Sequence, residues 1–483
     1  MTLPRVIELN PPPDVAACLE RFRTLPYCLL LDSARRHARL GRYSFLMADP
    51  LRVLHLESVN NLNGREANAD LFAQAQRLGE QYPAKDEEPG VVPFTGGLAG
   101  FCSYDLNRAL ERLPAPRFDE FQLPLAVLGV YDVVLAWDHV AGRAWLISRG
   151  WPPEGGPGSA QRATDRLRQF QKILSAARAM PDVQSPAAAN ISDLTIADLC
   201  IAGPLPGYPM VWSNFSREQY TGAIEQAREY ICAGDIFQVN LAQRLLTPVR
   251  EPAWQMYARL RMANPATFGG YFDFGAGQIL SASPERFLRV RRGKVEARPI
   301  KGTRPRSPWP EADLFAGDEL LASEKDRAEN VMIVDLLRND LSRVCTAESV
   351  RVAELCRLEL YEYVQHLVSV INGELAPGQS AWDLLRAAWP GGSITGAPKV
   401  RAMEIITELE CVARGPYCGA LLYAGANGDI DANLLIRTLI VSRGWAQFPV
   451  GGGITTASDP ATEYTETWHK AAGLLRALEF NAQ

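Results

Sequence analysis

Apolar side chains between Tyr220 and Ile231 recur every three or four residues, which is the spacing of one helix face. Ser216 and Gln219, just before them, are spaced as a capping box, in which each side chain bonds the other residue's backbone N–H. Gly234 follows the last apolar position, and glycine is common at a helix C-terminus. The pattern predicts an amphipathic helix that ends at Gly234.

Strand-like alternation follows this helix. Polar and apolar residues alternate over 235–246, which places Gln238 and its chain neighbours on opposite faces of a strand. Two further segments, 279–290 and 294–300, predict a hairpin with an Arg-Gly turn between them.

Two short signals near the C-terminus complete the pattern. Asn427-Gly428 is typical of a tight hairpin turn, and Asp459-Pro460 is typical of a helix start. Long antiparallel hairpins interspersed with helices predict the α+β class.

The segment 151–212 differs in composition from its flanks, because it is rich in Pro, Gly, Ala and Ser around one helix-like stretch. We interpret it as a connector. The region 1–150 is then expected to complete a core that it shares with a catalytic region, 213–483.

Composition excludes several classes of protein. The chain has 483 residues, 47% hydrophobic and 22% charged, as globular proteins do. Its net charge of −5 comes from interspersed acids and bases, which disfavours a polyanion-binding protein. The longest apolar run, Leu123–Trp137, is too short for a membrane span, and the N-terminus lacks the apolar core of a signal peptide. Nine cysteines without a Cys-x-x-Cys pair indicate reduced thiols in a cytoplasmic protein and no zinc site.

One lysine stands out in the segment 296–306. Lys301 lies among Arg298, Arg304 and Arg306, although arginine would serve equally well as a plain charge. A lysine amine can lose its proton and attack carbon, whereas an arginine cannot. Neighbouring positive charge and burial would both disfavour the ammonium form. The alternative interpretation is an exposed basic turn.

Two pairs of acids share helical spacing. Asp326 and Glu329 lie three residues apart, as do Glu463 and Glu466. Like charges at this spacing repel, so neither pair stabilises its own helix. A hard cation between the two helices would favour both pairs, and oxygen ligands without His or Cys indicate Mg²⁺. The alternative is two solvated acidic faces, although a glycine-rich segment before the second pair suits close backbone approach to a ligand.

Three other polar residues lie in apolar surroundings. Glu285 ends a predicted strand sixteen residues before Lys301, and the hairpin could bring the two onto neighbouring strands, where a carboxyl could act as a general acid or base. A salt bridge to Arg286 is the alternative.

His366 lies within an apolar strand, where a histidine is more often a core residue. Arg437 lies within an apolar run and must find an anion.

The segment 391–399 resembles a phosphate loop at first but lacks the Gly-Lys-Ser/Thr ending, so nucleotide binding is not indicated. Its hydroxyl pair, Ser393 and Thr395, flanked by glycines such as Gly396, still suits a carboxylate ligand at a helix start.

Together these segments resemble the chorismate-utilising enzymes, which include anthranilate synthase large subunits, aminodeoxychorismate synthase component I, and isochorismate and salicylate synthases. The matching motifs, in order, are Asp-Ile-Phe-Gln-Val-Asn (235–240), Ser-Pro-Glu-Arg-Phe (283–287), Pro-Ile-Lys-Gly-Thr-Arg-Pro-Arg (299–306), Lys-Asp-Arg-Ala-Glu-Asn (325–330), Gly-Ser-Ile-Thr-Gly-Ala-Pro-Lys (392–399), Gly-Gly-Ile-Thr (452–455) and Glu-Tyr-Thr-Glu-Thr (463–467). The first third resembles the family more loosely. The resemblance implies a large α/β/β/α sandwich with antiparallel sheets.

The resemblance also assigns roles by motif. It implies Mg²⁺ ligands at Glu329 and Glu466, with Asp326 and Glu463 reaching the metal through water. Glu285 would be the general acid that assists departure of the ring's 4-hydroxyl. Ser393 and nearby backbone (Thr395, Gly396) are expected to contact the ring carboxylate, and His366 is expected beside the ring. The enolpyruvyl carboxylate would be held by Tyr417, Arg437 and Gly453. Lys470 would support the metal site.

Two positions separate the branches of the family. The water-using branch has a lysine at the place of Gln238, and glutamine cannot act as a base, so the nucleophile is expected to be ammonia. The anthranilate branch typically has alanine at the place of Lys301. A lysine there resembles the branch that forms 4-amino-4-deoxychorismate for 4-aminobenzoate and folate synthesis, in which the amine adds to ring carbon 2 before ammonia attacks carbon 4.

The resemblance implies a partner as well. The chain has no glutaminase set of Cys, His and Glu, so a separate glutamine amidotransferase subunit is expected to supply ammonia. An anthranilate synthase large subunit is the nearest alternative, although 264–271 lacks the tyrosine-methionine pair that helps those enzymes bind tryptophan. Ser33 keeps the serine of that pocket, which leaves tryptophan as a candidate ligand.

Two alternatives belong to other classes. A binding protein that has lost catalysis would have lost a metal carboxylate, Glu285 or Lys301, and the sequence retains all of them. A nucleic-acid binder that uses the basic segment 298–306 is disfavoured by the acidic balance of the chain.

Overall fold

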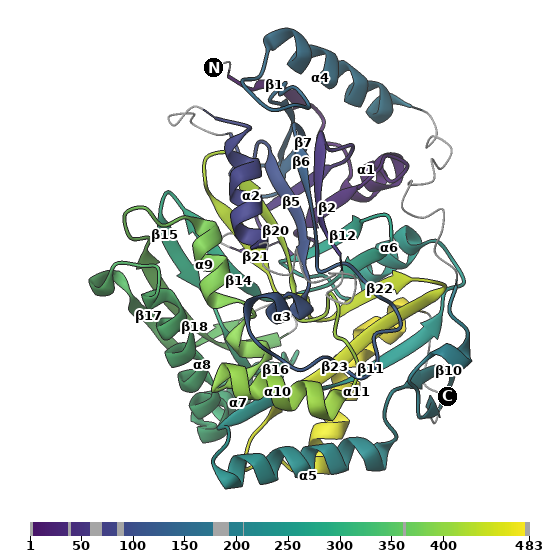
Figure 1. Cartoon of the computed structure of the whole chain (residues 1–483), viewed down its shortest axis with the longest axis vertical. Coiled ribbons are helices and arrows are strands. Elements are labelled where there is room, and N and C mark those ends of the chain that lie inside the picture. Colours follow the sequence, from purple (N-terminus) through teal and green to yellow (C-terminus); the bar gives the residue numbers. More distant parts are fainter. Residues whose placement is uncertain are drawn as a thin grey trace.

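The computed structural model describes residues 3–36, 40–57, 70–84, 91–176, 193–205, 207–360 and 364–478. In these residues two large antiparallel sheets face each other, with helices on their outer faces (Figure 1). The predicted α+β class with antiparallel sheets is confirmed.

The larger sheet joins strands from both ends of the chain. Its order is β1 (Arg5–Leu9), β8 (Arg143–Ser148), β7 (Val133–Asp138), β3 (Tyr43–Met47), β2 (Leu29–Asp32), β12 (Gly269–Asp273), β13 (Gln278–Ser281), β22 (Thr438–Ser442), β23 (Trp445–Ile454), β11 (Gln238–Pro248), β10 (Tyr208–Ser213) and β9 (Gly203–Leu205), and β19 (Gly396–Ala397) pairs with β11. The N-terminal part meets the C-terminal part where β2 pairs with β12.

The smaller sheet is joined in the same way, through the pair β20–β5. Its order is β16 (Ile300–Pro305), β18 (Val364–Glu374), β15 (Lys294–Ala297), β14 (Arg286–Arg291), β21 (Ile430–Asn433), β20 (Ala420–Gly425), β5 (Gly97–Cys102), β6 (Ala126–Tyr131) and β4 (Arg52–Leu56), and β17 (Arg351–Leu360) pairs with β18. Strands that are far apart in the sequence thus form one core.

Helices cover the outer face of each sheet (Figure 1). Those that pack on the larger sheet are α1 (Val15–Phe22), α4 (Ala160–Ser175), α5 (Arg217–Ala233), α6 (Ala253–Ala263), α10 (Lys399–Glu410) and α11 (Pro460–Ala477). Those on the smaller sheet are α2 (Leu71–Glu80), α7 (Pro310–Ala322), α8 (Glu324–Ser342) and α9 (Ala381–Ala388), and the short α3 (Asn107–Leu110) follows β5.

Strand alternation sorts apolar side chains into layers. Leu29 packs between the two sheets, whereas its neighbour Leu30 packs against the helices of the larger sheet. Both are fully buried, because side chains alternate between the faces of a strand and both faces are covered here. The layers therefore follow the order α/β/β/α.

Most predicted elements are confirmed. Helix α5 begins with the Ser216–Gln219 capping box and ends at Gly234, whose φ of 85° is the left-handed value that glycine tolerates. The hairpin β14–β15 turns at Arg292-Gly293. The prediction of one strand over 279–290 is wrong, because the chain leaves the larger sheet after Ser281 and enters the smaller sheet at Arg286. Pro284 lies in this crossing and has no N–H to donate to a strand ladder.

The predicted connector contains α4, which packs on β8 and β1. Arg166 of this helix bonds Asp132, which is fully buried, and Asp49. Residues 177–192 of the connector lie outside the described residues.

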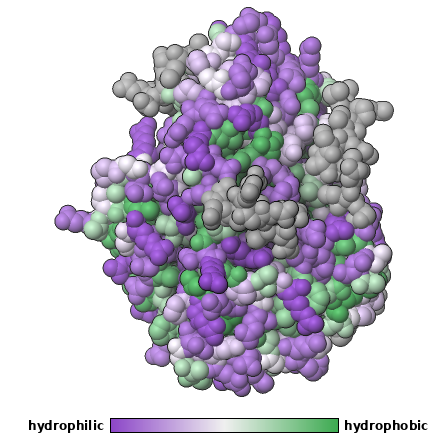
Figure 2. All heavy atoms as spheres, viewed as in Figure 1, coloured by the Kyte–Doolittle hydropathy of each residue, from purple (hydrophilic) through white to green (hydrophobic). Residues whose placement is uncertain are grey.

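Two further predictions concern the chain as a whole. None of the helices that the structure describes is long and apolar enough to cross a membrane. All nine cysteines are free thiols. On the face shown in Figure 2, hydrophilic residues predominate and apolar residues form only small patches.

Removal of the Arg166 guanidinium should destabilise the N-terminal part of the larger sheet. Burial already raises the pKa of Asp132, and Arg166 opposes that shift. In Arg166→Met this carboxylate loses its cation, so we expect the free energy of unfolding in urea to fall by about 3 to 5 kcal/mol. The double variant Asp132→Asn, Arg166→Met should regain most of the loss. An equal loss in both variants would show that packing of Arg166, and not its charge, stabilises this region.

Candidate active site

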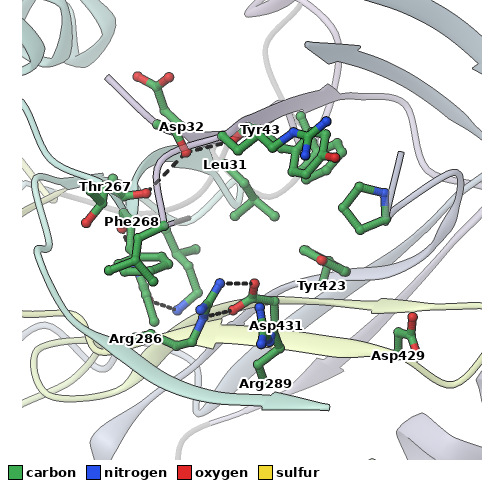
Figure 3. Close-up of a pocket in the computed structure, with 18 of the residues that line it drawn as sticks. Leu31, Asp32, Tyr43, Thr267, Phe268, Arg286, Arg289, Tyr423, Asp429 and Asp431 are labelled. Carbon is green, nitrogen blue, oxygen red and sulfur yellow. Dashed lines mark hydrogen bonds and ion pairs between the residues drawn. The ribbon is translucent and has the colours of Figure 1, made fainter. Parts of the chain in front are cut away.

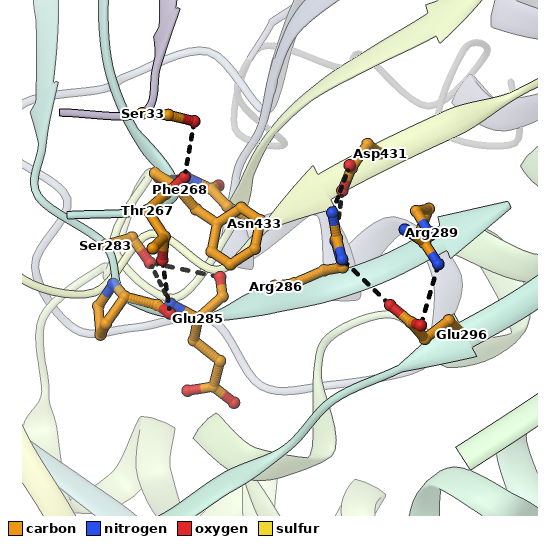
Figure 4. A network of polar contacts seen from close by, with 11 residues as sticks. Ser33, Thr267, Phe268, Ser283, Glu285, Arg286, Arg289, Glu296, Asp431 and Asn433 are labelled. Carbon is orange, nitrogen blue, oxygen red and sulfur yellow. Dashed lines mark hydrogen bonds and ion pairs between the residues drawn. The ribbon is translucent and has the colours of Figure 1, made fainter. Parts of the chain in front are cut away.

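Glu285 lies where the chain crosses from one sheet to the other. Its side chain is buried, accepts a hydrogen bond of 2.9 Å from the Ser393 hydroxyl and accepts another from the backbone N–H of Ile300. Figure 4 shows its carboxyl directed away from the neighbouring network around Arg286. Burial raises the pKa of Glu285 to about 7, although Ser393 and the positive charge of Lys301 oppose the shift. Near neutral pH this carboxyl can therefore both hold and release a proton.

Lys301 lies beside Glu285 because of strand register. The β14–β15 pairing ends with Leu288 opposite Ala297, shortly before each strand reaches these residues. The backbone N–H of Ile300 bonds the Glu285 carboxyl, and the positive charge of the next residue, Lys301, acts on it. The predicted hairpin juxtaposition of the two residues is thus confirmed.

The Lys301 side chain points inward and is 11% exposed. Its Nζ lies 3.9 Å from Oε2 of Glu329. It also lies 3.3 Å from the point that a Cβ on Gly453 would occupy, and that point is 2.4 Å from Nε2 of Gln238. A side chain at Gly453 would therefore displace the amide of Gln238, and glycine keeps this space open.

The arginines near Lys301 in the sequence do not surround its amine. Each is bonded to an acid elsewhere: Arg298 to Glu359, Arg304 to Glu319 and Asp326, and Arg306 to Asp313. The positive charge that these arginines were expected to place near Lys301 is therefore balanced by acids. Their side chains each reach a carboxylate, and the ionic neighbour of the Lys301 amine is Glu329.

The two acid pairs converge from α8 and α11. Lys325 of α8 bonds Glu463 of α11 at 3.1 Å, so the two helices meet at this point. Carboxylate oxygens of Glu463 and Glu466 lie 3.4 and 3.7 Å from the point that a Cβ on Gly452 would occupy. The glycine-rich strand β23 thus lies directly against both acids.

Each acid has a basic neighbour. Lys470 bonds Glu466 at 2.7 Å, and Arg304 lies 3.4 Å from Asp326. Burial tends to raise the pKa of Glu466, but Lys470 brings it below the ordinary value, whereas burial raises the pKa of Glu329. Within the described residues, no three acids, histidines or cysteines lie close enough together to hold a metal as they stand.

The donor set nevertheless fits a hard cation. It contains carboxylates alone, it lies at the meeting point of two helices, and the bases that neutralise it have flexible side chains. A divalent cation would take the place of ammonium groups at Glu463 and Glu466.

A second part of the site is cationic. Within the described part of the chain, the Arg437 guanidinium forms no hydrogen bond or ion pair, and burial lowers its pKa. Together with Arg35, Arg476 and His366 it lines a cavity of about 500 Å³. A buried guanidinium without an anion favours binding of a ligand carboxylate.

His366 is held neutral in this cavity. Its Nδ1 lies 2.9 Å from the Thr303 hydroxyl, and burial, assisted by Arg437 and Arg35, lowers its pKa to about 4. It therefore presents an uncharged ring at neutral pH.

The other residues predicted to contact the ligand are held by bonds within the fold. The Thr395 hydroxyl donates to the backbone carbonyl of Gly391 at 3.1 Å, so it closes a turn, while Gly396 pairs with β11. Tyr417 is buried, and the next residue bonds the backbone of Leu435, two positions before Arg437.

Ser33 lies in a different cavity, of about 210 Å³ (Figure 3). Its hydroxyl donates to the backbone carbonyls of Tyr43 and Thr267. Figure 4 shows that a polar network links Ser33 through Thr267 to the segment around Glu285. On the far side of the cavity Arg286 bonds Asp431 at 2.8 Å, whereas the side chain of the preceding residue, Glu285, bonds Ser393.

Sequence reasoning missed several residues that complete the site. Lys325 bonds Glu463, Ser458 donates to the same carboxylate at 2.7 Å, and Thr303 bonds His366. Lys325 could have been found from the sequence, because it directly precedes Asp326 in the acidic motif. Ser458 and Thr303 carry no pattern of their own.

Burial of the Glu285 carboxylate should reduce stability at alkaline pH. Its pKa rises from an ordinary value of 4.5 to about 7 on folding, so the stability present below pH 4.5 is lost as pH rises through 7. The loss amounts to about 3 kcal/mol. We expect Glu285→Gln, which can still accept from Ser393, to unfold at higher urea than the wild type at pH 8 and to lose this advantage at pH 5. The exposed control Glu225→Gln should show no such pH dependence, and a constant difference would contradict the buried carboxylate.

Comparisons with known proteins agree with this site. Residues 26–476 match the family of chorismate binding enzymes. The chain is 38% identical to anthranilate synthase component 1 of Thermus thermophilus, over 96% of this chain and 95% of the relative. It is 37% identical to aminodeoxychorismate synthase component 1 of Klebsiella aerogenes, over 99% of this chain and 100% of that relative. Its fold is similar to a crystal structure of anthranilate synthase component I from Streptococcus pneumoniae, with a TM-score of 0.72 and 30% identity over 91% and 93% of the two chains. The chain therefore belongs to the chorismate-binding family and is a chorismate-utilising enzyme.

Proposed function

We propose that this enzyme converts chorismate and ammonia to 4-amino-4-deoxychorismate, the precursor of 4-aminobenzoate in folate synthesis. The observation that carries the proposal is the inward amine of Lys301 next to Glu285, whose pKa is about 7. An enzyme that used ammonia alone would have no need of a second nitrogen nucleophile at this place.

Two steps follow from these residues. The unprotonated Lys301 amine forms a bond to ring carbon 2 while the bond from carbon 4 to its hydroxyl breaks, and Glu285 gives its proton to the leaving oxygen, which departs as water. Ammonia then forms a bond to carbon 4, and the bond between carbon 2 and Nζ breaks. Glu285, now ionised, can take up the proton that the new amine releases.

The substrate's carboxylates would be held at two ends of the site. The unpaired guanidinium of Arg437, with Tyr417 and the backbone at Gly453, suits the enolpyruvyl carboxylate. Ser393 and the backbone at Gly396 would contact the ring carboxylate.

Mg²⁺ would be held by Glu329 and Glu466, with Asp326 and Glu463 reaching it through water. When bound, it would neutralise the ring carboxylate, which the surrounding acids would otherwise repel. Lys470, bonded to Glu466, would orient that ligand.

The proposal includes a partner. A glutamine amidotransferase subunit would supply ammonia, because the sequence of this chain contains no glutaminase set of Cys, His and Glu. The enzyme would work in the cytoplasm, which its nine free thiols support. The cavity at Ser33 is a candidate site for tryptophan.

Synthesis of anthranilate is the second candidate, because one relative at 38% identity carries that name. The two reactions differ in product, since anthranilate synthesis releases pyruvate. Mass and ultraviolet identification of the product from chorismate, ammonium and Mg²⁺ separates them.

Lys301→Ala should abolish most product formation. Loss of the nucleophile is expected to reduce the rate of 4-amino-4-deoxychorismate formation by more than about a thousandfold, while calorimetry shows chorismate still bound. The exposed strand residue Lys294 provides a matched control, and Lys294→Ala should behave as the wild type. Unchanged turnover by Lys301→Ala would refute the covalent role.

Glu466→Gln should weaken Mg²⁺ binding. The amide removes one anionic ligand, so we expect the Mg²⁺ dissociation constant, measured by calorimetry with chorismate present, to rise at least about tenfold. Glu324→Gln, an exposed change of equal charge on α8, should leave it unaltered. If both variants bind Mg²⁺ equally well, Glu466 is not a ligand.

A further inference from the structure

Arg414, between α10 and β20, is a buried cation that the proposed reaction does not use. Its side chain is 3% exposed and donates two hydrogen bonds to Glu410, from Nε at 2.8 Å and from Nη2 at 2.5 Å. Glu410 is equally buried and also accepts from the backbone N–H of Ala242 at 2.8 Å. An ion pair of this kind is weak evidence for a role in stability, because apolar residues can often replace it without loss.

Two further hydrogen bonds of Arg414 reach the proposed substrate site. Nη1 donates to the backbone carbonyl of Ile394 at 3.0 Å, and Nη2 donates to that of Asn240 at 2.7 Å. Ile394 directly follows Ser393, whose hydroxyl donates to Glu285 at 2.9 Å. The guanidinium therefore fixes the backbone of the segment that presents the Ser393 hydroxyl.

Arg414 also contacts Tyr417, which comes from a different segment. The guanidinium carbon lies 5.8 Å from the centre of the Tyr417 ring and 4.6 Å from that of the Tyr104 ring. The backbone carbonyl of Arg414 accepts from the N–H of Tyr417 at 3.2 Å. Since a cation is attracted to an aromatic face, these contacts restrict the orientation of the Tyr417 ring.

The shape of the guanidinium suits it to hold both segments. It is planar and presents its N–H donors in fixed directions, so the four bonds of Arg414 set its acceptors at fixed separations. An ammonium group could neutralise Glu410, but a single nitrogen cannot reproduce this set of bonds.

We propose that Arg414 is a positioning residue for chorismate, which sets the segment of Ser393 and the ring of Tyr417 at the separation that the two substrate carboxylates require. The proposal rests on the chorismate contacts of the proposed function and not on its product. An enzyme that makes anthranilate from chorismate would use Arg414 in the same way.

Two variants separate positioning from stability. Arg414→Met leaves the Glu410 charge buried and unpaired, so it should unfold at lower urea than the wild type, whereas the double variant Glu410→Gln, Arg414→Met contains neither charge and should regain most of this loss. In both variants we expect kcat/KM for chorismate, with ammonium chloride as the nitrogen source, to fall by about a hundredfold, as small displacements of ligand contacts cause. The KM for ammonia, at saturating chorismate, should stay as in the wild type.

The chain offers two controls. Arg244 is also 3% exposed, and among the residues that the structure describes its guanidinium bonds Glu120 alone, at 2.7 Å. Arg244→Met should therefore lose stability, as Arg414→Met does, and keep the wild-type kcat/KM for chorismate. Glu410→Gln alone keeps the guanidinium and its bonds to both carbonyls, so it should also keep this kcat/KM.

Three outcomes would overturn the proposal. Recovery of kcat/KM together with stability in the double variant would show that Arg414 acts through stability alone. An equal loss of kcat/KM in Arg244→Met, or in Glu410→Gln, would show that any weakened core has this effect. An unchanged kcat/KM in Arg414→Met would show that neither segment depends on the guanidinium. Product identity from the wild-type enzyme reports separately on the proposed reaction.

Discussion

The passage of the chain from one sheet to the other between Ser281 and Arg286 is the constraint on which the site depends. It brings a carboxyl into the space between two apolar layers, where burial keeps the Glu285 pKa near 7. The same passage starts β14, whose pairing with β15 brings Lys301 alongside. The Glu285 carboxyl and the Lys301 amine are therefore brought together by the same passage of the chain.

Charge balance governs the other half of the site. Four acidic side chains meet four basic ones, so the cluster is close to neutral before any ligand arrives: Asp326, Glu329, Glu463 and Glu466 face Lys301, Lys325, Lys470 and Arg304. In the proposed function, a divalent cation would add two positive charges and a dianionic substrate would add two negative ones. The site is thus suited to ligands of opposite charge that arrive together, because each removes the electrostatic cost of the other.

Much of the fold and of the candidate site could be predicted from the sequence where local rules apply. The capping box of α5, the Arg292-Gly293 turn and the acid pairs at helical spacing all follow from contacts within a few residues. The break at Pro284 was missed because apolar alternation continues through it, and only the sheet topology separates β13 from β14. The acids that balance the arginines near Lys301 could not be foreseen, because some come from distant elements, such as Glu359 on β17. Contacts between distant segments, like those of Arg414, are visible only once the surroundings are known.

Consecutive side chains at the crossing point in different directions, since Glu285 bonds Ser393 while Arg286 lines the cavity beside Ser33. Side chains along an extended chain alternate with a period of two. Insertion or deletion of a single amino acid here would exchange the two side chains, so that a guanidinium would face Ser393 and a carboxylate would face the cavity beside Ser33. The length of this link is therefore constrained more strictly than its composition.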